Sequence, residues 1–176
     1  MSRKATGFTL IEVMASVSIL SILLAVALPA FAALLERQRA ASAVAALVSH
    51  MTQARLAAVK YRRPTVLCPS TDGQTCLRGS DWSQGWMMFV DRDNTRLPEQ
   101  ASDVLQFDPQ PRSRHLRIRS SAGRSYLRYM PDGRSAGSNL TINICDRDGQ
   151  RLAAVVVNNA GRPRSERGPG GTSCSS

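Results

Sequence analysis

The feature that most constrains this chain is an apolar segment near its N-terminus that contains a single carboxylate. Residues 8–31 are 24 consecutive positions whose only charged side chain is Glu12. As an α-helix this segment would be about 36 Å long, which is enough to cross a bilayer. Arg3 and Lys4 precede it. Because basic flanking residues stay on the cytoplasmic side, we expect the rest of the chain to lie outside the cytoplasm.

Glu12 argues against two ordinary explanations of this segment, a plain transmembrane anchor and a secretory signal peptide. A carboxylate inside a membrane costs about 3 kcal/mol and usually has a partner, so a plain transmembrane anchor leaves it unexplained. A secretory signal peptide with Ala25-Val26-Ala27 as its cleavage site would start the mature chain at Leu28. A charge early in the apolar core argues against that alternative.

The chain changes character after Pro29, which lacks an N–H and should disrupt the helix locally. From Leu34 onward, apolar residues recur at three- and four-residue steps with charged and amide side chains between them. This pattern predicts an amphipathic helix whose apolar stripe packs against a sheet. Pro64 biases Arg63 away from helix, so we expect the helix to end near Tyr61.

Beyond Pro64, short β-prone runs are separated by turn signals such as Pro131-Asp132-Gly133 and Asp148-Gly149. Their close spacing favours antiparallel hairpins. The predicted fold class is therefore α+β: a long N-terminal helix, half membrane-spanning and half amphipathic, packed on an antiparallel β-sheet head. The expected strands are 65–68, 85–91, 116–119, 126–130, 140–144 and 152–157.

Four cysteines lie in the part expected outside the cytoplasm: Cys68, Cys76, Cys145 and Cys174. No two of them have the CxxC spacing typical of zinc sites, and an extracytoplasmic head favours disulfides. Four cysteines allow three pairings. We favour Cys68–Cys76, which closes a small polar loop, and Cys145–Cys174, which tethers the glycine-rich tail to a strand. Four free thiols are the alternative.

The chain is strongly basic, with a formal net charge of +10 from 23 Lys and Arg against 13 Asp and Glu. Such a chain attracts polyanions, including nucleic acid and anionic lipid. One basic zone could extend a DNA-binding track or form the solvated side of a sheet, and we slightly favour the latter. Trp82 and Trp86 are expected in the core rather than on a nucleic-acid surface. The basic zone comprises Arg112, Arg114, Arg117, Arg119, Arg124 and Arg128.

The sequence offers little support for catalysis. His50 falls in the expected helix and His115 in an expected strand, and neither has a nucleophile motif nearby. Asp91-Arg92-Asp93-Asn94 hints at calcium ligands but lacks the Gly and terminal Glu of an EF-hand loop, so we interpret it as a turn. We expect no enzymatic activity, no cofactor and no metal site.

Gly7-Phe8-Thr9-Leu10-Ile11-Glu12 resembles the processing motif of type IV prepilins and type II secretion pseudopilins. The resemblance implies that a prepilin peptidase cleaves between Gly7 and Phe8 and that Phe8 is then N-methylated. It also implies that Glu12 pairs with the terminal amine of a neighbouring subunit in a filament, since a buried carboxylate needs a cation.

The resemblance predicts a single-pass inner-membrane protein with a cytoplasmic N-terminus and a periplasmic head, which is surface-exposed when incorporated in a pilus. The expected segments are a leader (1–7), a transmembrane and filament-core helix (8–31), an amphipathic helix (32–62), a β head (63–160) and a basic, disulfide-tethered tail (161–176).

Residues 67–73, 82–91, 131–135 and 157–164 resemble the GspH/FimT group of minor pilins and pseudopilins. FimT-like members are implicated in DNA uptake during natural transformation and share a Gly-Arg-x-Arg motif that contacts DNA. The motif here is Gly161-Arg162-Pro163-Arg164, with Arg167 just after it. Glycine permits a tight turn, and two arginines can project from a loop as forks that bind phosphates of duplex DNA without sequence preference.

The resemblance leaves two other roles open. One is a structural minor pseudopilin of the type II secretion system, which is the role of the GspH branch. The other is a minor pilin that primes pilus assembly. In all three roles the expected partners are other pilins or pseudopilins, the prepilin peptidase and the inner membrane; DNA is a partner only in the first.

Overall fold

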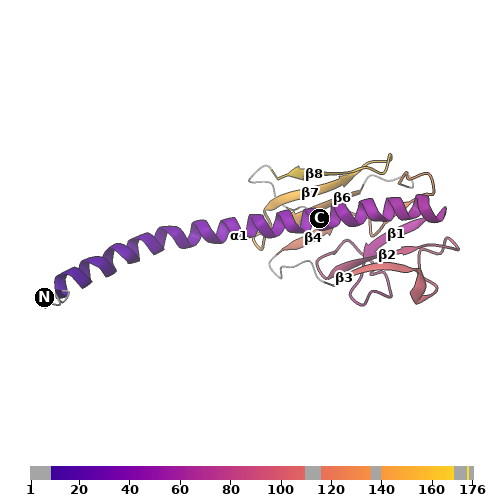
Figure 1. Cartoon of the computed structure of the whole chain (residues 1–176). Coiled ribbons are helices and arrows are strands. Elements are labelled where there is room, and N and C mark those ends of the chain that lie inside the picture. The colour runs from indigo at the N-terminus through magenta and orange to yellow at the C-terminus, as the bar shows by residue number, and fades with distance from the viewer. Residues whose placement is uncertain (1–8, 110–115, 136–139, 169–173, 175–176) are drawn as a thin grey trace, which may run out of the picture. The chain divides into compact units, whose positions relative to one another are not determined.

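The computed structural model describes residues 9–109, 116–135, 140–168 and 174. Contacts divide the chain into two compact units, residues 1–36 and 37–176, and each is described by itself. Helix α1 (Leu10–Tyr61) contributes to both, because its residues up to Glu36 belong to the first unit and those from Arg37 onward to the second (Figure 1).

The first unit is an apolar helical segment with exposed side chains. It is long and apolar enough to cross a membrane. The hydroxyls of Ser16, Ser18 and Ser21 donate to backbone carbonyls four residues earlier, so these polar groups are satisfied within the helix. The helix continues through Pro29, so the disruption expected there does not end it.

The second unit begins with the amphipathic half of α1. Its buried residues recur at helical spacing and include Ala43, Leu47, Met51 and Ala54, as the sequence periodicity predicted. The helix ends at Tyr61, where the next residue, Arg62, adopts a left-handed conformation with φ of 51°.

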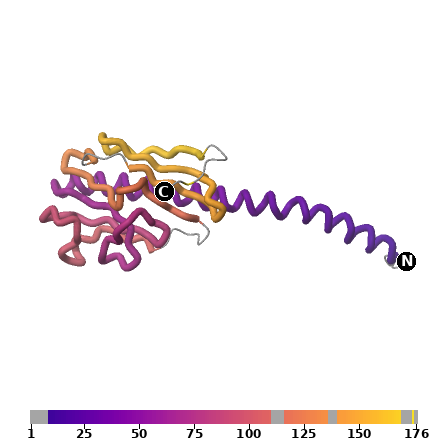
Figure 2. Tube along the Cα trace, turned by 180° about the vertical axis from the view of Figure 1, so that it is seen from behind, coloured from indigo at the N-terminus to yellow at the C-terminus, as the bar shows by residue number. Residues whose placement is uncertain are grey.

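The strands form two four-stranded antiparallel sheets (Figures 1 and 2). The first has the order β3-β2-β1-β5 and the second the order β4-β6-β7-β8. The predicted antiparallel β-sheet head is confirmed; its division into two sheets was not part of the prediction, because local sequence patterns give strands but not their partners. The strands are β1 (Thr65–Pro69), β2 (Gly85–Val90), β3 (Val104–Pro109), β4 (Arg117–Ser120), β5 (Leu127–Tyr129), β6 (Leu140–Cys145), β7 (Arg151–Val157) and β8 (Pro163–Arg167), with a short 3-10 helix η1 (Ala101–Asp103) before β3.

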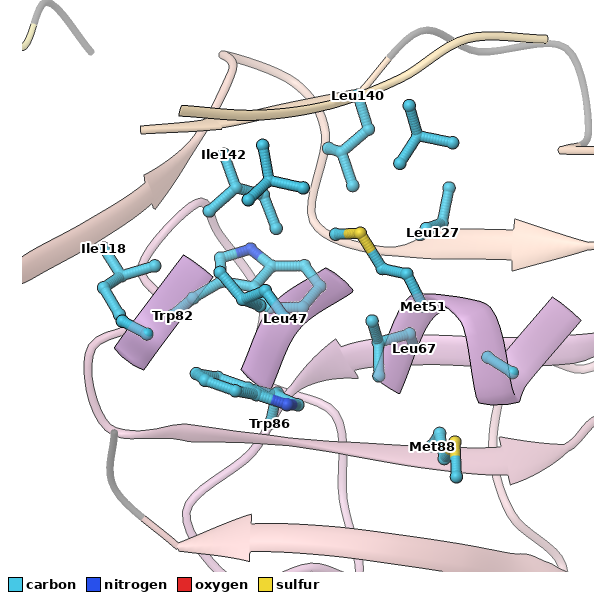
Figure 3. Close-up of a cluster of buried hydrophobic side chains, with 14 of the residues drawn as sticks. Leu47, Met51, Leu67, Trp82, Trp86, Met88, Ile118, Leu127, Leu140 and Ile142 are labelled. Carbon is cyan, nitrogen blue, oxygen red and sulfur yellow. The ribbon is translucent and has the colours of Figure 1, made fainter. Parts of the chain in front are cut away.

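The core lies between α1 and the two sheets, and Figure 3 shows its central side chains. Leu47 and Met51 of α1 are fully buried there. Trp82 is fully buried and Trp86 is 1% exposed, so both tryptophans lie in the core as predicted. A second cluster, which includes Val66 and Phe89, buries other side chains of the first sheet.

His50 is the polar residue of this helix–sheet interface. Its Nδ1 accepts a hydrogen bond from Trp86 Nε1 at 2.7 Å, and its Nε2 lies 2.6 Å from the side-chain amide of Gln106. Because an indole N–H can only donate, the neutral imidazole must carry its proton on Nε2, and Gln106 must turn its amide oxygen towards that N–H to accept it. Burial lowers the pKa of His50, although Asp108, 4.0 Å away, acts in the opposite direction.

This arrangement predicts that acid destabilises the head. The unfolded chain takes up the His50 proton near its ordinary pKa of about 6.5, before the folded chain does, so the free energy of unfolding should fall as the pH is lowered below about 6.5 towards the folded pKa. Urea unfolding between pH 5 and 8, followed by tryptophan fluorescence, measures this dependence. His50→Asn keeps an acceptor for Trp86 but cannot titrate, and an unchanged pH slope in that variant would contradict the prediction.

Candidate nucleic-acid interface

Gly161 forms a buried turn at the base of the predicted DNA-binding motif. Its φ is +74°, and its N–H donates to the Asn158 carbonyl at 2.8 Å. A Cβ at this position would overlap the carbonyl oxygen of Gly133 and would lie 3.1 Å from the ring of Tyr129. Both the left-handed backbone and the close approach therefore require glycine.

The partner of this turn is the Pro131-Asp132-Gly133 turn, which belongs to another of the motifs singled out in the sequence. The Gly133 carbonyl accepts a hydrogen bond from Arg55 Nε of α1 at 2.8 Å. Ser135 Oγ donates to the Asn158 carbonyl at 2.9 Å. Two motifs about 28 residues apart in sequence thus meet in space, and Arg55 links them to the helix. Both turns could be predicted from the sequence, but the hydrogen bond by which Arg55 supports them could not.

Tyr129 lies beneath the Gly161 turn. It is fully buried, and burial raises the pKa of its hydroxyl well above the ordinary range, although the nearby Arg55 acts in the opposite direction. The ring therefore acts as a neutral packing surface for Gly161.

Of the arginines that follow, which were predicted in a loop, Arg164 and Arg167 lie on a strand and Arg162 lies just before it. β8 pairs antiparallel with β7 and forms one end of the second sheet's order, with Val156 opposite Arg164 and Val157 opposite Pro163. Proline is compatible with the first residue of an edge strand, which explains why Pro163 does not prevent this pairing. β8 has few apolar residues of its own, and its pairing with the apolar β7 could not be seen in local sequence.

Strand alternation separates the three predicted DNA-binding arginines. Arg164 and Arg167 are three residues apart on β8 and point to opposite faces, and Arg162 precedes the strand. The register places Arg167 opposite Ala153, which packs against the core. All three arginines are exposed, and Arg162 and Arg164 flank Pro163 at the start of β8.

The charge of the pair is partly balanced within β8. Arg164 Nη2 lies 3.1 Å from Glu166 Oε1, with both side chains well exposed at 67% and 43%. An exposed ion pair of this kind contributes little to stability. Arg162 makes no ion pair with any residue that the structure describes.

A disulfide between Cys145 and Cys174 anchors the chain after β8. The N–H of Cys174 donates to the Gly149 carbonyl at 2.8 Å, and that of Gly168 to the Leu152 carbonyl at 3.0 Å. β8 is thus held by the Gly161 turn before it and by the hairpin of β6 and β7 after it.

The other disulfide joins Cys68 and Cys76, so the structure contains both pairs that we favoured. In the loop that it closes, the carboxylate of Asp72 accepts hydrogen bonds from the Gln74 and Thr75 backbone N–H groups and from the Thr75 hydroxyl, which hold the pKa of Asp72 well below its usual range.

The Asp91-Arg92-Asp93-Asn94 segment begins a turn held by ion pairs. Buried Asp91 lies 3.1 Å from Arg128 Nη2, and Arg92 Nε lies 2.6 Å from Asp103 Oδ1. Within the described ranges, no group of three or more His, Cys, Asp or Glu residues is placed to hold a metal ion. Arg128 is therefore engaged inside the head and is separate from the exposed arginines.

The predicted processing site lies mostly outside the described residues. Gly7 and Phe8 belong to residues 1–8, and Arg112, Arg114 and His115 fall in another undescribed stretch, 110–115. Glu12 lies in the first turn of α1, where its N–H donates to the Thr9 carbonyl at 3.2 Å.

The helix with an apolar first half and a second half packed on antiparallel sheets defines a pilin-like protein. Residues 43–161 match the family model described as type II transport protein GspH, and residues 2–28 match the prokaryotic N-terminal methylation motif. The chain belongs to the GspH family of minor pilins and pseudopilins.

Solved structures share this fold. The type IV minor pilin FimU of Pseudomonas aeruginosa strain PAO1 is similar at 22% identity with a TM-score of 0.58, covering 80% of this chain and 98% of FimU. Escherichia coli GspH is 14% identical, with a TM-score of 0.52 over 75% of this chain and 90% of GspH. The minor pseudopilin EpsH of the Vibrio cholerae type 2 secretion system is 9% identical, with a TM-score of 0.50 over 70% of this chain and 93% of EpsH. No curated protein matches the chain significantly.

Proposed function

We propose that this protein is a minor type IV pilin that binds duplex DNA without sequence preference through Arg162 and Arg164 and serves DNA uptake in natural transformation. The observation that carries the proposal is that these two exposed arginines flank Pro163 at the start of a strand, β8, whose backbone is fixed at both ends. Gly161 anchors one end, and the Cys145–Cys174 disulfide anchors the chain after the other.

The chemistry of the pair suits phosphate. A guanidinium group presents planar paired donors that match the oxygens of a phosphate group. Because the Gly161 turn and the disulfide restrict the backbone, binding should order little more than the two side chains. Contacts of this kind position DNA but do not read its sequence, which suits the capture of arbitrary DNA.

A second candidate is a structural minor pseudopilin of a type II secretion system. It is favoured by the family model, whose description is a type II transport protein, and by the fold similarity to EpsH. This role requires no DNA binding, so the experiment below separates the two candidates.

We expect Arg162→Ala/Arg164→Ala to weaken binding to a random-sequence duplex roughly tenfold, because two phosphate contacts are lost. The slope of log affinity against log salt concentration should decrease by about 1.8. Gel-shift titration of the full chain in nonionic detergent, at several salt concentrations, measures both quantities.

Two control variants sharpen this test. Lys60→Ala/Arg62→Ala removes the same charge from exposed positions at the C-terminal end of α1 and should leave affinity nearly unchanged. Glu166→Gln removes the acid beside Arg164 and should tighten binding. If the wild-type chain does not bind DNA, the pseudopilin role becomes the better answer; if all variants bind equally, Arg162 and Arg164 are not the site.

We further propose that a prepilin peptidase cleaves between Gly7 and Phe8, that Phe8 is N-methylated, and that Glu12 pairs with the new terminal amine of a neighbouring pilin in the filament. The match of residues 2–28 to the N-terminal methylation motif supports this proposal. The segment after residue 8 would then anchor the chain in the inner membrane, with the head in the periplasm. The intact mass of the membrane-extracted protein should correspond to a chain that starts at methylated Phe8; a chain that starts at Leu28 would indicate signal-peptide cleavage instead.

A further inference from the structure

Building on the proposed DNA binding, we infer that the DNA-binding surface includes, besides Arg162 and Arg164 at the start of β8, Arg117 and Arg119 on β4 at the other end of the second sheet. The sheet order β4-β6-β7-β8 places these two pairs of arginines at opposite ends of one sheet. The second pair therefore lies far from the Gly-Arg-Pro-Arg motif in sequence but on the same structural element.

Strand register shows that Arg119 and Arg164 share a face. Arg119 pairs with Asn143, Asn143 with Ala154, and Ala154 with Glu166, so these residues form one row across the sheet. The adjacent row contains Thr141, Val156 and Arg164. Because directly paired residues in an antiparallel sheet point to the same side, Arg119 and Arg164 point to one face.

This face is the outer one. Along β4, Arg117 and Arg119 are exposed, whereas Ile118 and Ser120 between and after them are buried. Ile118 belongs to the hydrophobic core, so the arginines point away from it. We favoured the solvated side of a sheet for this pair, and the structure places it there, on the same face as Arg164 of β8.

The spacing of the two pairs fits a duplex. Three strand intervals separate β4 from β8, or about 14 Å, which is comparable to the roughly 12 Å width of the major groove. Between them Thr141, Asn143 and Val156 are partly exposed, whereas Ala154 is buried. Arg117 pairs with Cys145, which is joined to Cys174 and also pairs with Arg151. Cations at the two ends of the sheet can therefore contact phosphates on the two sides of a groove.

The arginines on β4 are available for such contacts. Neither Arg117 nor Arg119 makes an ion pair with another residue in the described part of the chain. Asp81 lies next to Arg119 through an isolated β-bridge, but its carboxylate accepts the Ser83 N–H at 2.9 Å. The acid at the opposite edge, Glu166, lies beside Arg164.

The test uses the full chain in nonionic detergent and a fluorescently labelled 20-base-pair duplex of random sequence, with anisotropy titrations at several salt concentrations. Arg117→Gln/Arg119→Gln, with the β8 arginines intact, should weaken binding roughly tenfold and reduce the salt slope by about 1.8. In the variant with all four arginines changed to Gln, the slope of log affinity against log salt concentration should decrease by about 3.6. Lys60→Gln/Arg62→Gln is the control with the same loss of charge, and its salt slope should remain that of the wild type.

The outcomes separate this inference from the proposed function. If Arg117→Gln/Arg119→Gln binds like the wild type while Arg162→Ala/Arg164→Ala does not, the extended surface is wrong and the DNA-binding role stands. If the control weakens binding as much as the β4 variant does, the effect is one of net charge, and the extended surface is again wrong. If the wild type itself does not bind, both proposals are overturned. Fluorescence of the buried Trp82 and Trp86 verifies that each variant is folded.

Discussion

Replacing Gly161 with alanine is expected to destabilise the head by roughly 3 kcal/mol. A left-handed conformation costs an L-residue about 1 kcal/mol, and an added methyl group in a filled site about 2 kcal/mol more. The methyl group would overlap the Gly133 carbonyl oxygen and lie 3.2 Å from the Ser135 backbone nitrogen. The Gly133 carbonyl cannot withdraw freely, because Arg55 of α1 is hydrogen-bonded to it.

Urea unfolding followed by tryptophan fluorescence measures this loss, since both tryptophans are buried in the head. Gly123→Ala is a closely matched control. Its φ is also +74°, but no atom lies within 4 Å of the Cβ that would be added. It should show the backbone cost alone, about 1 kcal/mol. Equal losses in the two variants would show that the contact between the two turns does not constrain Gly161.

The same substitution should also weaken DNA binding, although it leaves every arginine in place. If Gly161 fixes the start of β8, its displacement moves Arg162 and Arg164 out of position. We expect affinity for the duplex to fall in Gly161→Ala, under conditions where the variant is still folded, and to remain unchanged in Gly123→Ala.

Removing the Cys145–Cys174 disulfide is expected to cost about 3.6 kcal/mol, because its cysteines are 29 residues apart and the bond restricts a long loop of the unfolded chain. The measurement compares urea unfolding of Cys145→Ala/Cys174→Ala with that of the oxidised wild type. Binding to DNA should weaken as well, since the chain after β8 loses its anchor.

The other disulfide provides the control. Cys68 and Cys76 are 8 residues apart, for which the same relation gives about 2.5 kcal/mol. Cys68 and Cys145 are both fully buried, so each double variant also leaves one small cavity in the core. A loss in Cys68→Ala/Cys76→Ala as large as that in Cys145→Ala/Cys174→Ala would mean that loop length does not determine the effect.

Much of the fold could be predicted from local patterns. The helical spacing of Leu47, Met51 and Ala54 and the proline at position 64 indicated the second half of α1 and its end. Alternation gave β4 and β6, and an apolar run gave β7. The pairing of these strands into two sheets could not be predicted, because it depends on contacts between residues far apart in the sequence.

Two strands were missed for different reasons. β3 carries Leu105 and Phe107 in alternation, a signal that was present but short. β8 contains Pro163, two arginines and a glutamate, and nothing in its own sequence indicates a strand. Its strand conformation depends on antiparallel pairing with the apolar β7, which adds β8 to the second sheet.

The candidate site was predictable in part. The need for glycine at position 161 followed from the motif, and the structure gives the physical reasons in its φ and in the nearby Gly133. The grouping of Arg167 with Arg162 and Arg164 assumed a loop, and the alternation of β8 points Arg167 to the face opposite that of Arg164. The position of Arg117 and Arg119 on the same face required the order of the strands.

The position of β8 at the end of its sheet has a consequence for solubility. An edge strand with free N–H and C=O groups can pair with a strand of another molecule and start aggregation. Proline and charged side chains along such an edge discourage this pairing, and β8 carries Pro163, Arg164, Glu166 and Arg167. The charges that we assign to DNA binding would then also keep individual subunits apart before assembly, so neutralising them exposes the chain to self-association.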